Sequence, residues 1–370
     1  MTDRPPQFDD TPLPPPQVGG ESVVRGKHTA SDGAVPGDNS GSVVSSEPLS
    51  SGIGPGRTVS GAGLSGMGGK ARLGDRVFAA LTSGAAAFVI ILVALIATFL
   101  LVKSVPSIAA DKVNFFTSTE WSPDPGNLRF GIANLLWVTV IISVVALVVA
   151  MPIAIGIALF ITQYAPRRLS KPVAYIIDLL AAIPSIVYGI WGFTILAPAL
   201  EPVQRALSHI PIPLFDNLHP NRTIFDGAVV LAVMILPIIT AISRDVFERT
   251  PRANIEAALA LGATKWEMIR MAVLPHGRAG VISGSMLGLG RALGETIAVY
   301  LILSTTSGAF SFSLFTSGET FASKIANGSS EFNNPASTGA YIAAGLVLFV
   351  LTFIVNSAAR AIVNRRKDFS

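Results

Sequence analysis

Residues 250–299 read TPRANIEAALALGATKWEMIRMAVLPHGRAGVISGSMLGLGRALGETIAV, and this stretch determines the expected fold. Its first half is polar and basic and contains turn-forming residues, whereas its second half is apolar yet includes Arg291 and Glu295. Ionisable residues inside an apolar membrane segment are costly, so they mark candidates for function. We expect the first half to form a loop at the membrane surface and the second half to form a membrane helix.

The first part of the loop has the signals of a short helix. Thr250 followed by Pro251 suits an N-cap with proline at the first helical position, where its missing N–H is not needed. The helix is predicted over residues 253–261. Gly262 is expected to end it, because glycine readily adopts the left-handed conformation that follows a helix.

A second short helix is predicted after the glycine. Thr264 and Glu267 have the spacing of a capping box, and Pro275 is expected to end this helix. The coupling loop, residues 250–275, is therefore predicted to be a compact docking element of two helices. Helix chemistry alone does not distinguish this element from an ordinary helical hairpin on the surface.

The composition is that of a membrane protein. Of the 370 residues, 50% are hydrophobic and only 14% are charged, whereas soluble domains have roughly 25% charged residues. The net charge of +4 is too small to indicate a nucleic-acid partner. The absence of cysteine excludes disulfides, thiol catalysis and thiolate metal sites.

Two domains are predicted. Residues 1–69 are rich in proline, glycine and serine and have few large apolar side chains, so they are predicted to be a disordered cytoplasmic tail. Residues 70–370 are predicted to be an all-α transmembrane domain of six helices. The expected spans cover residues 77–102, 132–161, 173–199, 224–243, 279–304 and 339–359.

The first expected span is a retained helix and not a signal peptide. At 1.5 Å per residue it would reach about 39 Å, enough to cross a membrane core of ~30 Å with some tilt. The apolar run is too long and begins too late in the chain to be a signal peptide. Proline inside other spans is compatible with membrane helices, because neighbouring groups can satisfy the freed carbonyls.

The distribution of lysine and arginine predicts the orientation. They are more numerous on the side of the coupling loop, where the expected loops and C-terminal tail contain Arg167, Arg168, Lys171, Arg244, Arg249, Arg252, Lys265, Arg270, Arg278, Arg360, Arg365, Arg366 and Lys367. The opposite side has Lys103, Lys112, Arg129, Arg205, Arg222 and Lys324. Positive residues concentrate on the cytoplasmic side, so both termini and the coupling loop are predicted to be cytoplasmic.

The outer connections are longer than simple hairpins need. The first (residues 103–131) contains Trp121 and two prolines, and the last (residues 305–338) is polar with several phenylalanines. Two interpretations remain open: a landing surface for a soluble partner, or an ordered cap over the helices.

Arg291 and Glu295 are the candidate site of transport. Both are expected near the middle of the membrane, on one helix face because they are four residues apart. In one interpretation Arg291 supplies a cation for an anionic substrate while Glu295 neutralises and orients it in the empty site. In the other, the two residues form a purely structural pair. A guanidinium matches the oxygens of phosphate or carboxylate in bidentate geometry.

Other polar and small residues have structural explanations. Gly280, Gly284 and Gly288, and separately Gly290 and Gly294, predict close helix packing, with a glycine-lined path as the alternative. Asp178 is expected to pair with a basic loop residue such as Arg167 or Arg168, or else to act in gating. No metal-ligand cluster, nucleophile–base arrangement or phosphate-binding glycine-lysine loop is found, so no catalytic residue or metal site is predicted.

The spacing in the coupling loop resembles the EAA loop of ABC importer permeases, which inserts into a groove of the ATPase subunit. The matching residues are Glu256, Ala257, Ala258, Gly262, Leu274 and Pro275. One departure is Ala272, where that family usually has isoleucine.

Two further segments narrow the resemblance. IIDLLAAIPSIVYGIWG (residues 176–192) and GLGRALGETIAV (residues 288–299) are similar to the permease subunits of the bacterial phosphate-specific ABC importer. The second segment resembles the C-type subunit more than its A-type partner, and NFFTSTEWSPDPG in the first outer connection is also similar. The resemblance covers about residues 75–365.

The resemblance implies a multi-pass permease of the bacterial plasma membrane with a type I importer fold. The implied partners are an A-type permease, a dimer of ATPase subunits and an extracytoplasmic phosphate-binding protein, besides membrane lipid. This chain would bind no cofactor, because ATP and Mg would bind the partner ATPase. Arg291 and Glu295 match the family's transport residues. The implied cargo is inorganic phosphate.

Three alternatives remain. The chain could be a permease for another oxyanion such as sulfate or molybdate. It could be an ion-coupled secondary carrier that uses Asp178 and Glu295 as proton sites. It could also be a membrane scaffold that only recruits partners.

Overall fold

The computed structural model describes residues 73–365, apart from residues 125, 217–221, 305–309 and 333. The predicted tail, residues 1–69, lies outside the described residues. The helices are α1 (Leu73–Ala109), α2 (Ala133–Leu159), α3 (Arg167–Ala182), α4 (Ser185–Trp191), α5 (Ala197–Leu207), α6 (Ile224–Glu248), α7 (Arg252–Ala260), α8 (Lys265–Met268), α9 (Leu274–Leu293), α10 (Ile297–Ile302), α11 (Phe321–Asn327) and α12 (Pro335–Arg365). Strands β1 (Trp121–Asp124) and β2 (Asn127–Phe130) form an antiparallel hairpin. The prediction of a helical membrane protein is confirmed.

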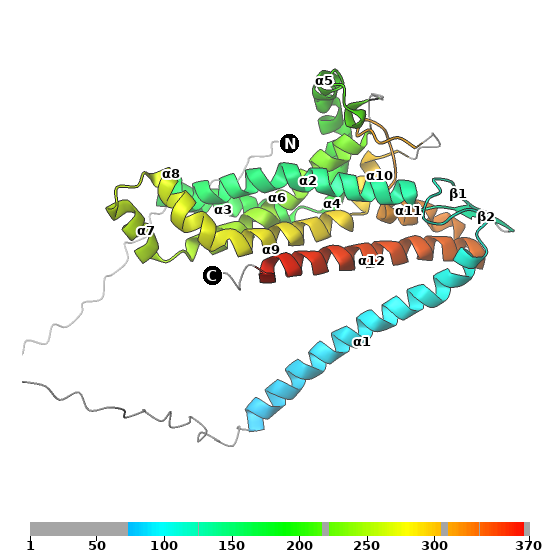
Figure 1. Cartoon of the computed structure of the whole chain (residues 1–370), viewed down its shortest axis with the longest axis horizontal. Helices are drawn as coiled ribbons and strands as arrows, with labels where there is room; N and C mark the ends of the chain where they lie inside the picture. The colour runs from blue at the N-terminus through cyan, green and yellow to red at the C-terminus, as the bar shows by residue number, and fades with distance from the viewer. Residues whose placement is uncertain (1–72, 125, 217–221, 305–309, 333, 366–370) are drawn as a thin grey trace, which may run out of the picture. The chain divides into compact units, whose positions relative to one another are not determined.

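Helices α2, α6 and α9 lie side by side and form the centre of the fold (Figure 1). Ile142 of α2 and Ile235 and Ile239 of α6 are completely buried there, because each helix turns its apolar face toward the others. One end of this bundle, which carries α7 and α8, is named the α7–α8 end. The other, which carries β1, β2 and α11, is named the hairpin end (Figure 1).

The predicted glycine seam on α9 is confirmed for its first stripe. A Cβ atom on Gly280 would lie 2.2 Å from the Val246 side chain, and one on Gly288 would lie 3.1 Å from Ile239, so α9 packs closely on α6. The second stripe is different, because a Cβ on Gly290 would meet only Asn356, at 3.8 Å. Gly290 therefore makes no tight helix contact within this part of the chain.

Five helices among the described residues are long and apolar enough to cross a membrane: Gly74–Ala109, Ala133–Tyr164, Ser185–Leu207, Ile224–Glu248 and Pro335–Ala361. They include the first, second, fourth and sixth predicted spans. In α1, none of the most apolar window is buried within the chain, so its apolar surface is free to contact lipid or another membrane protein.

The third predicted span, residues 173–199, is wrong as a continuous helix. It is interrupted at Ile183 and Pro184, where α3 ends and α4 begins. Proline disfavours the helical conformation of the residue before it and removes a helical hydrogen bond, so the break follows from Pro184. The Tyr188 hydroxyl donates a hydrogen bond of 2.8 Å to the Leu180 carbonyl and so links the two helices across the break.

The fifth predicted span, residues 279–304, is also wrong as one helix. Helix α9 ends at Leu293, Gly294 follows as its C-cap, and α10 begins only at Ile297. The glycine-rich α9 is not among the apolar spans found in the described residues. The physical reason is the run Gly294, Glu295 and Thr296, because glycine favours a helix end and the two polar residues bond locally to backbone.

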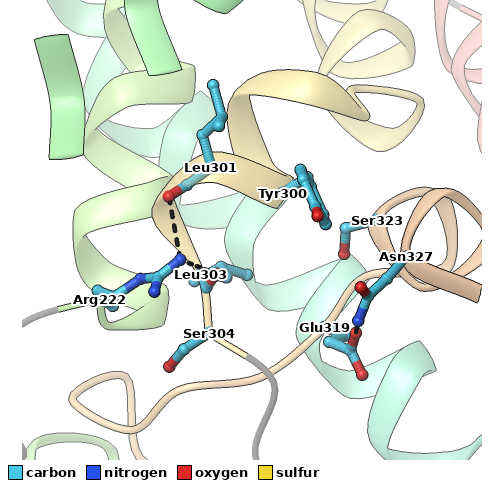
Figure 2. A pocket seen from close by; sticks show the side chains of 8 residues that line it. All are labelled: Arg222, Tyr300, Leu301, Leu303, Ser304, Glu319, Ser323 and Asn327. Atoms are coloured by element: carbon cyan, nitrogen blue, oxygen red, sulfur yellow. Dashed lines mark hydrogen bonds between the residues drawn. The ribbon is translucent and has the colours of Figure 1, made fainter. Parts of the chain in front are cut away.

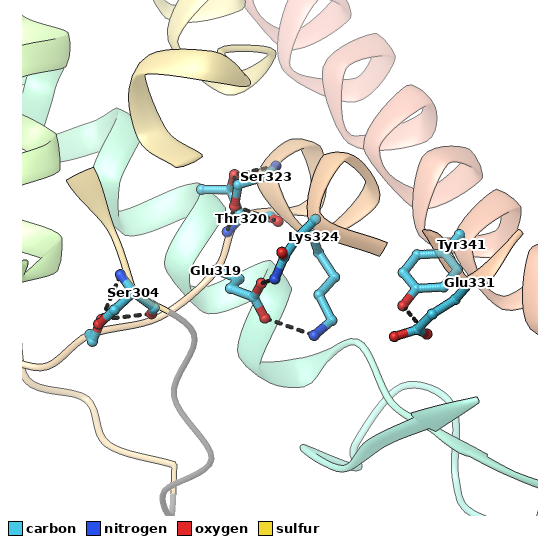
Figure 3. A network of polar contacts seen from close by, with 9 residues as sticks. Ser304, Glu319, Thr320, Ser323, Lys324, Glu331 and Tyr341 are labelled. Carbon is cyan, nitrogen blue, oxygen red and sulfur yellow. Dashed lines mark hydrogen bonds and ion pairs between the residues drawn. The ribbon is translucent and has the colours of Figure 1, made fainter. Parts of the chain in front are cut away.

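The hairpin end is an ordered cap over the bundle. Phe130 of β2 and Phe321 of α11 are completely buried in a cluster with the first turns of α2 and α12. Lys324 lies 2.8 Å from Glu319 and 5.5 Å from the Trp121 ring centre, so it joins α11 to β1. Figure 3 shows this pair beside the capping box of Thr320 and Ser323. Of the two interpretations left open for the outer connections, an ordered cap is therefore present.

The coupling loop departs from its prediction at two points. Helix α7 begins at Arg252 and its N-cap is Pro251, not Thr250, because Pro251 has the extended ψ of 127° that a cap position requires. Pro275 does not end a helix. A π-helical segment, Ile269–Val273, runs from α8 directly into α9, and Pro275 lies in the first turn of α9 where its missing N–H costs nothing.

Two other predictions for the coupling loop are confirmed. Gly262 has φ +84°, the left-handed conformation. Thr264 and Glu267 form the capping box, in which Glu267 accepts hydrogen bonds from both the Thr264 backbone N–H and the Thr264 hydroxyl at 2.8 Å. The short helices are thus fixed by the local signals that the sequence contains.

Candidate functional site

Two broken helices pack against each other, and the transport candidates Arg291 and Glu295 lie at one of the breaks. Helix α4, which follows the break at Pro184, contacts α10, which follows the break after Gly294. The absence of a side chain at Gly189 lets the two helices approach closely. A Cβ atom at this position would lie 3.0 Å from the Ala298 Cα and 2.8 Å from the Leu301 side chain. Discontinuous membrane helices that meet near each other are a recurrent way to build a substrate path.

Arg291 lies in the last turn of α9, beside the break, and its side chain is exposed. The break after Gly294 follows within three residues, and α10 beyond it packs on α4. Among the described residues no carboxylate comes within ion-pair distance of Arg291. The guanidinium is thus near two helix breaks and is not neutralised by a neighbour in this part of the chain.

Glu295 makes a local hydrogen bond that the sequence did not predict. Its Oε1 accepts a hydrogen bond of 3.3 Å from the Ala298 backbone N–H, so the carboxylate caps the first turn of α10. The expected shared helix face of Arg291 and Glu295 is wrong, because the helix ends at Gly294 between them. The paired-charge interpretation in either form therefore receives no support from the described residues.

The face of α9 that includes Arg291 is open. Ser283, Leu287 and Arg291 lie at successive four-residue steps and are all exposed, and the Leu287 side chain is 59% exposed. The first glycine stripe, in which Gly284 and Gly288 are buried, follows the neighbouring line of the same helix. Arg291 therefore belongs to a surface that this chain does not cover.

The EAA-like residues of the coupling loop divide into two groups. Ala258 is buried and Leu274 packs against the same apolar cluster, which includes Phe247 of α6 and Ile269. Four others are exposed: Glu256, Ala257, Gly262 and Pro275. The first group fixes the loop to the bundle, and the second is available to a partner.

The tip of the coupling loop exposes large apolar side chains. Leu261 is 89% exposed and Trp266 is 57% exposed, although both are side chains that folded proteins normally bury. Leu261 directly follows α7 and precedes Gly262, and Trp266 lies in α8. Exposed apolar residues grouped on a polar loop mark a contact surface for another protein.

Two polar contacts hold the α7–α8 end in place. Lys265 lies 4.7 Å from the ring centre of Tyr164, at the end of the second span. Asp178 lies 3.7 Å from Arg244 of α6. The prediction that Asp178 pairs with a basic residue is confirmed, but the partner found is Arg244, because α3 packs along α6.

Arg222 is a functional candidate that sequence reasoning did not single out. It donates hydrogen bonds to the carbonyls of Leu301 and Leu303 at the end of α10, at 3.3 and 3.1 Å (Figure 2). It also lies 5.2 Å from the ring centre of Phe193, which follows α4. No local sequence pattern indicates these contacts, because the bonded residues are about 80 positions away.

Among the residues that the structure describes, no three histidine, cysteine or acidic side chains are grouped so that they could hold a metal ion. The candidate site thus combines one guanidinium, two helix breaks and an exposed coupling loop. These features are those of a membrane permease.

Comparison with known proteins supports this class. Residues 150–368 match the family model of the binding-protein-dependent transport system inner membrane component. The phosphate transport system permease protein PstC 2 of Mycobacterium tuberculosis is 56% identical over 299 residues, which cover 79% of this chain and 92% of that protein. PstC of Mycobacterium leprae is 53% identical over 277 residues, covering 73% of this chain and 87% of the relative.

Among solved structures, the MetNI methionine ABC transporter in an inward-facing conformation covers 63% of this chain and 95% of its own, with 18% identity and a TM-score of 0.44. The chain belongs to the inner-membrane-component family of binding-protein-dependent transport systems and, within it, to the PstC permease proteins. A permease subunit of this family is not itself catalytic.

Proposed function

We propose that this chain is the permease subunit of an ATP-driven importer that moves inorganic phosphate across the bacterial plasma membrane into the cell. The observation that carries the proposal is Arg291, an unneutralised guanidinium on an open helix face beside two helix breaks. Similarity to relatives named phosphate transport system permeases supports phosphate as the cargo.

The orientation proposed from the positive residues agrees with the chain path. The described chain has five apolar spans, and the broken pair α9 and α10 makes one further crossing. The chain therefore crosses six times. An even number of crossings returns the chain to its starting side. The α7–α8 end, where Arg249, Arg252, Lys265 and Arg270 lie, is then cytoplasmic, as are both termini.

The coupling loop is the proposed contact for an ATPase subunit dimer. Leu261 and Trp266 supply apolar surface, and Glu256 is exposed on α7. ATP and Mg would bind that partner, and this chain would bind no cofactor. ATP-driven closure of the ATPase would push on the coupling loop, which the continuous helix from α8 to α9 connects to Arg291.

The open face of α9 is the proposed contact for an A-type permease partner, and the hairpin end is the proposed contact for an extracytoplasmic phosphate-binding protein. Phosphate would pass between the two permeases along the surface that includes Leu287 and Arg291. A guanidinium that makes no ion pair among the described residues suits transfer, because a stronger site would slow release.

Uptake of radiolabelled phosphate by cells tests the cargo. Arg291→Ala is expected to abolish uptake while the protein is inserted normally, and Arg291→Lys to keep part of it. Arg205→Ala is the matched control, since Arg205 is exposed and pairs only with Glu201 among the described residues. Inhibition by excess sulfate or molybdate as strong as that by phosphate would assign the transporter to another oxyanion. Uptake that survives ATP depletion but not loss of the proton gradient would indicate a secondary carrier.

Detergent purification tests the ATPase contact. The ATPase subunit is expected to co-purify with the full chain, and Glu256→Lys or Gly262→Asp to weaken its recovery. Recovery of the same subunit with both variants would show that the coupling loop is not the contact.

A further inference from the structure

A cavity at the hairpin end of α10 has no role in the function proposed above. Its volume is about 330 Å³, and its walls include Arg222, Tyr300, Ser304, Glu319 and Asn327. Figure 2 shows Arg222 on one side of this cavity, with Glu319 and Asn327 on the other. These walls come from the lead-in to α6, from α10 and from the region of α11, so only tertiary structure brings them together.

Arg222 has no carboxylate at ion-pair distance among the described residues. The hydrogen bonds that it donates within this part of the chain go to neutral carbonyls, with its Nε 3.4 Å from the Ile302 oxygen and its Nη2 3.1 Å from the Leu303 oxygen. Arg222 also has φ +64°, the one positive φ of a residue other than glycine in the described ranges. This backbone conformation is energetically costly for a bulky residue and persists only where surrounding contacts hold it. The position of the Arg222 guanidinium is therefore set by those contacts.

The opposite wall offers a hydrogen-bond acceptor. Glu319 accepts hydrogen bonds from Lys324 at 2.8 Å (Figure 3) and from Asn327 at 3.1 Å (Figure 2), so its charge is compensated. A carboxylate has about four lone-pair positions, and two of those of Glu319 are used by these donors. The cavity thus combines a net positive charge from Arg222 with an acceptor that can receive an O–H.

We propose that this cavity binds a tetrahedral oxyanion that still carries a proton, with inorganic phosphate as its ligand. The proposal rests on the phosphate function proposed above and adds a second binding site to it. The Arg222 guanidinium would hold two oxygens of the anion, the Tyr300 hydroxyl would donate a hydrogen bond to it, and Glu319 would accept a hydrogen bond from the anion's O–H. Phosphate keeps a proton at neutral pH. Sulfate does not, so its oxygens would face the Glu319 carboxylate without a hydrogen between them.

The position of the cavity suits a first stop before Arg291. Arg222 binds the carbonyls at one end of α10, and the other end of α10 begins at the break beside Arg291. An anion in the cavity competes with these carbonyls for the guanidinium. Binding therefore weakens the hold of Arg222 on α10 and couples occupancy of the cavity to the half-helix next to the transport candidate.

Equilibrium binding of radiolabelled inorganic phosphate to the purified full chain tests this site. The measurement is made in an Arg291→Ala background, so that binding at Arg291 does not contribute. Arg222→Gln is expected to lower the affinity by about tenfold or more, the value of a charge-assisted hydrogen bond. Arg205→Gln removes an exposed arginine outside the cavity and is expected to leave the affinity unchanged.

Two more variants keep the test decisive if loss of Arg222 impairs folding. Tyr300→Phe leaves the Arg222 contacts intact and is expected to lower the affinity about two- to tenfold, as for one neutral hydrogen bond. Glu319→Gln is expected to let sulfate compete with phosphate, which it does not do in the parent protein. Phosphate binding that is unchanged by both Arg222→Gln and Tyr300→Phe, or sulfate that competes equally in the parent, would overturn the site. The phosphate function would survive such a result if Arg291→Ala still abolished uptake.

Discussion

The Glu295 carboxylate lies 3.3 Å from the backbone nitrogen of Ala298 and accepts its hydrogen bond, so this acidic residue caps a half-helix. Arg291, four positions earlier, lies on the other side of the helix end at Gly294. The two ionisable residues therefore have separate tasks. One presents a cation on an open face, and the other fixes the start of α10.

The capping role of Glu295 predicts a difference between two substitutions. Glu295→Gln keeps a side-chain oxygen that can accept the Ala298 N–H, so phosphate uptake is expected to remain within a fewfold of the parent. Glu295→Ala removes the cap, which costs about 1 kcal/mol, and is expected to reduce uptake more. Uptake assays on both variants at equal protein level check this. Equal loss in both variants would show that the charge is needed instead of the cap.

Gly262 predicts a conformational requirement in the coupling loop. Its φ of +84° costs a residue with a side chain about 1–2 kcal/mol. Gly262→Ala is therefore expected to weaken co-purification of the ATPase subunit, whereas Gly262→Asn is expected to weaken it less because asparagine tolerates this region. Gly84→Ala in α1, where a Cβ would meet nothing within 4 Å, serves as the control. The same recovery with alanine as with glycine would contradict the requirement.

The capping box of α8 predicts a pH dependence. Hydrogen bonds from the Thr264 backbone and hydroxyl hold the pKa of the Glu267 carboxyl below its usual value. The stabilisation is thus fully present above the usual pKa of about 4.3 and is lost as pH falls through the lowered pKa of the folded state. The protection of the Thr264 amide, that is, its hydrogen-exchange rate relative to the intrinsic rate at the same pH, is expected to fall on acidification. In Glu267→Gln this loss of protection should be absent, and its persistence would assign the effect to another group.

The close packing at the glycine seam predicts that adding a single methyl group there lowers the stability of the protein. A Cβ on Gly280 would lie 2.2 Å from the Val246 side chain, so Gly280→Ala forces α9 away from α6. Overpacking of this kind typically costs 1–3 kcal/mol, and the thermal unfolding midpoint in detergent is expected to fall. Gly290→Ala is the matched control on the same helix, because a Cβ there meets only Asn356 at 3.8 Å. An equal shift in both variants would contradict the seam.

Local signals explain why much of the coupling loop could be predicted. The left-handed Gly262 and the Thr264–Glu267 capping box depend on residues within a few positions of each other. Both features can therefore be predicted from the local sequence. Pro275 misled the prediction because a proline ends a helix in one context and begins one in another. The π-helical segment before it, Ile269–Val273, decides between these contexts.

The broken helices could be predicted only in part. Pro184 and the run Gly294, Glu295 and Thr296 are visible as disruptive residues, yet membrane helices often tolerate such residues without a break. The two helices that follow these breaks, α4 and α10, are brought together by their close contact at Gly189. That contact joins residues about a hundred positions apart, so no local pattern indicates it.

The sequence by itself determined that this chain is a helical membrane permease, because hydrophobic length, positive residues and the coupling-loop spacing are properties of short segments. Tertiary structure alone decided that Glu295 caps α10, that Asp178 meets Arg244 and that Arg222 faces Glu319 across a cavity. The physical reason is distance along the chain: side-chain partners in a helical bundle are chosen by which helix faces meet, and that choice is made by packing.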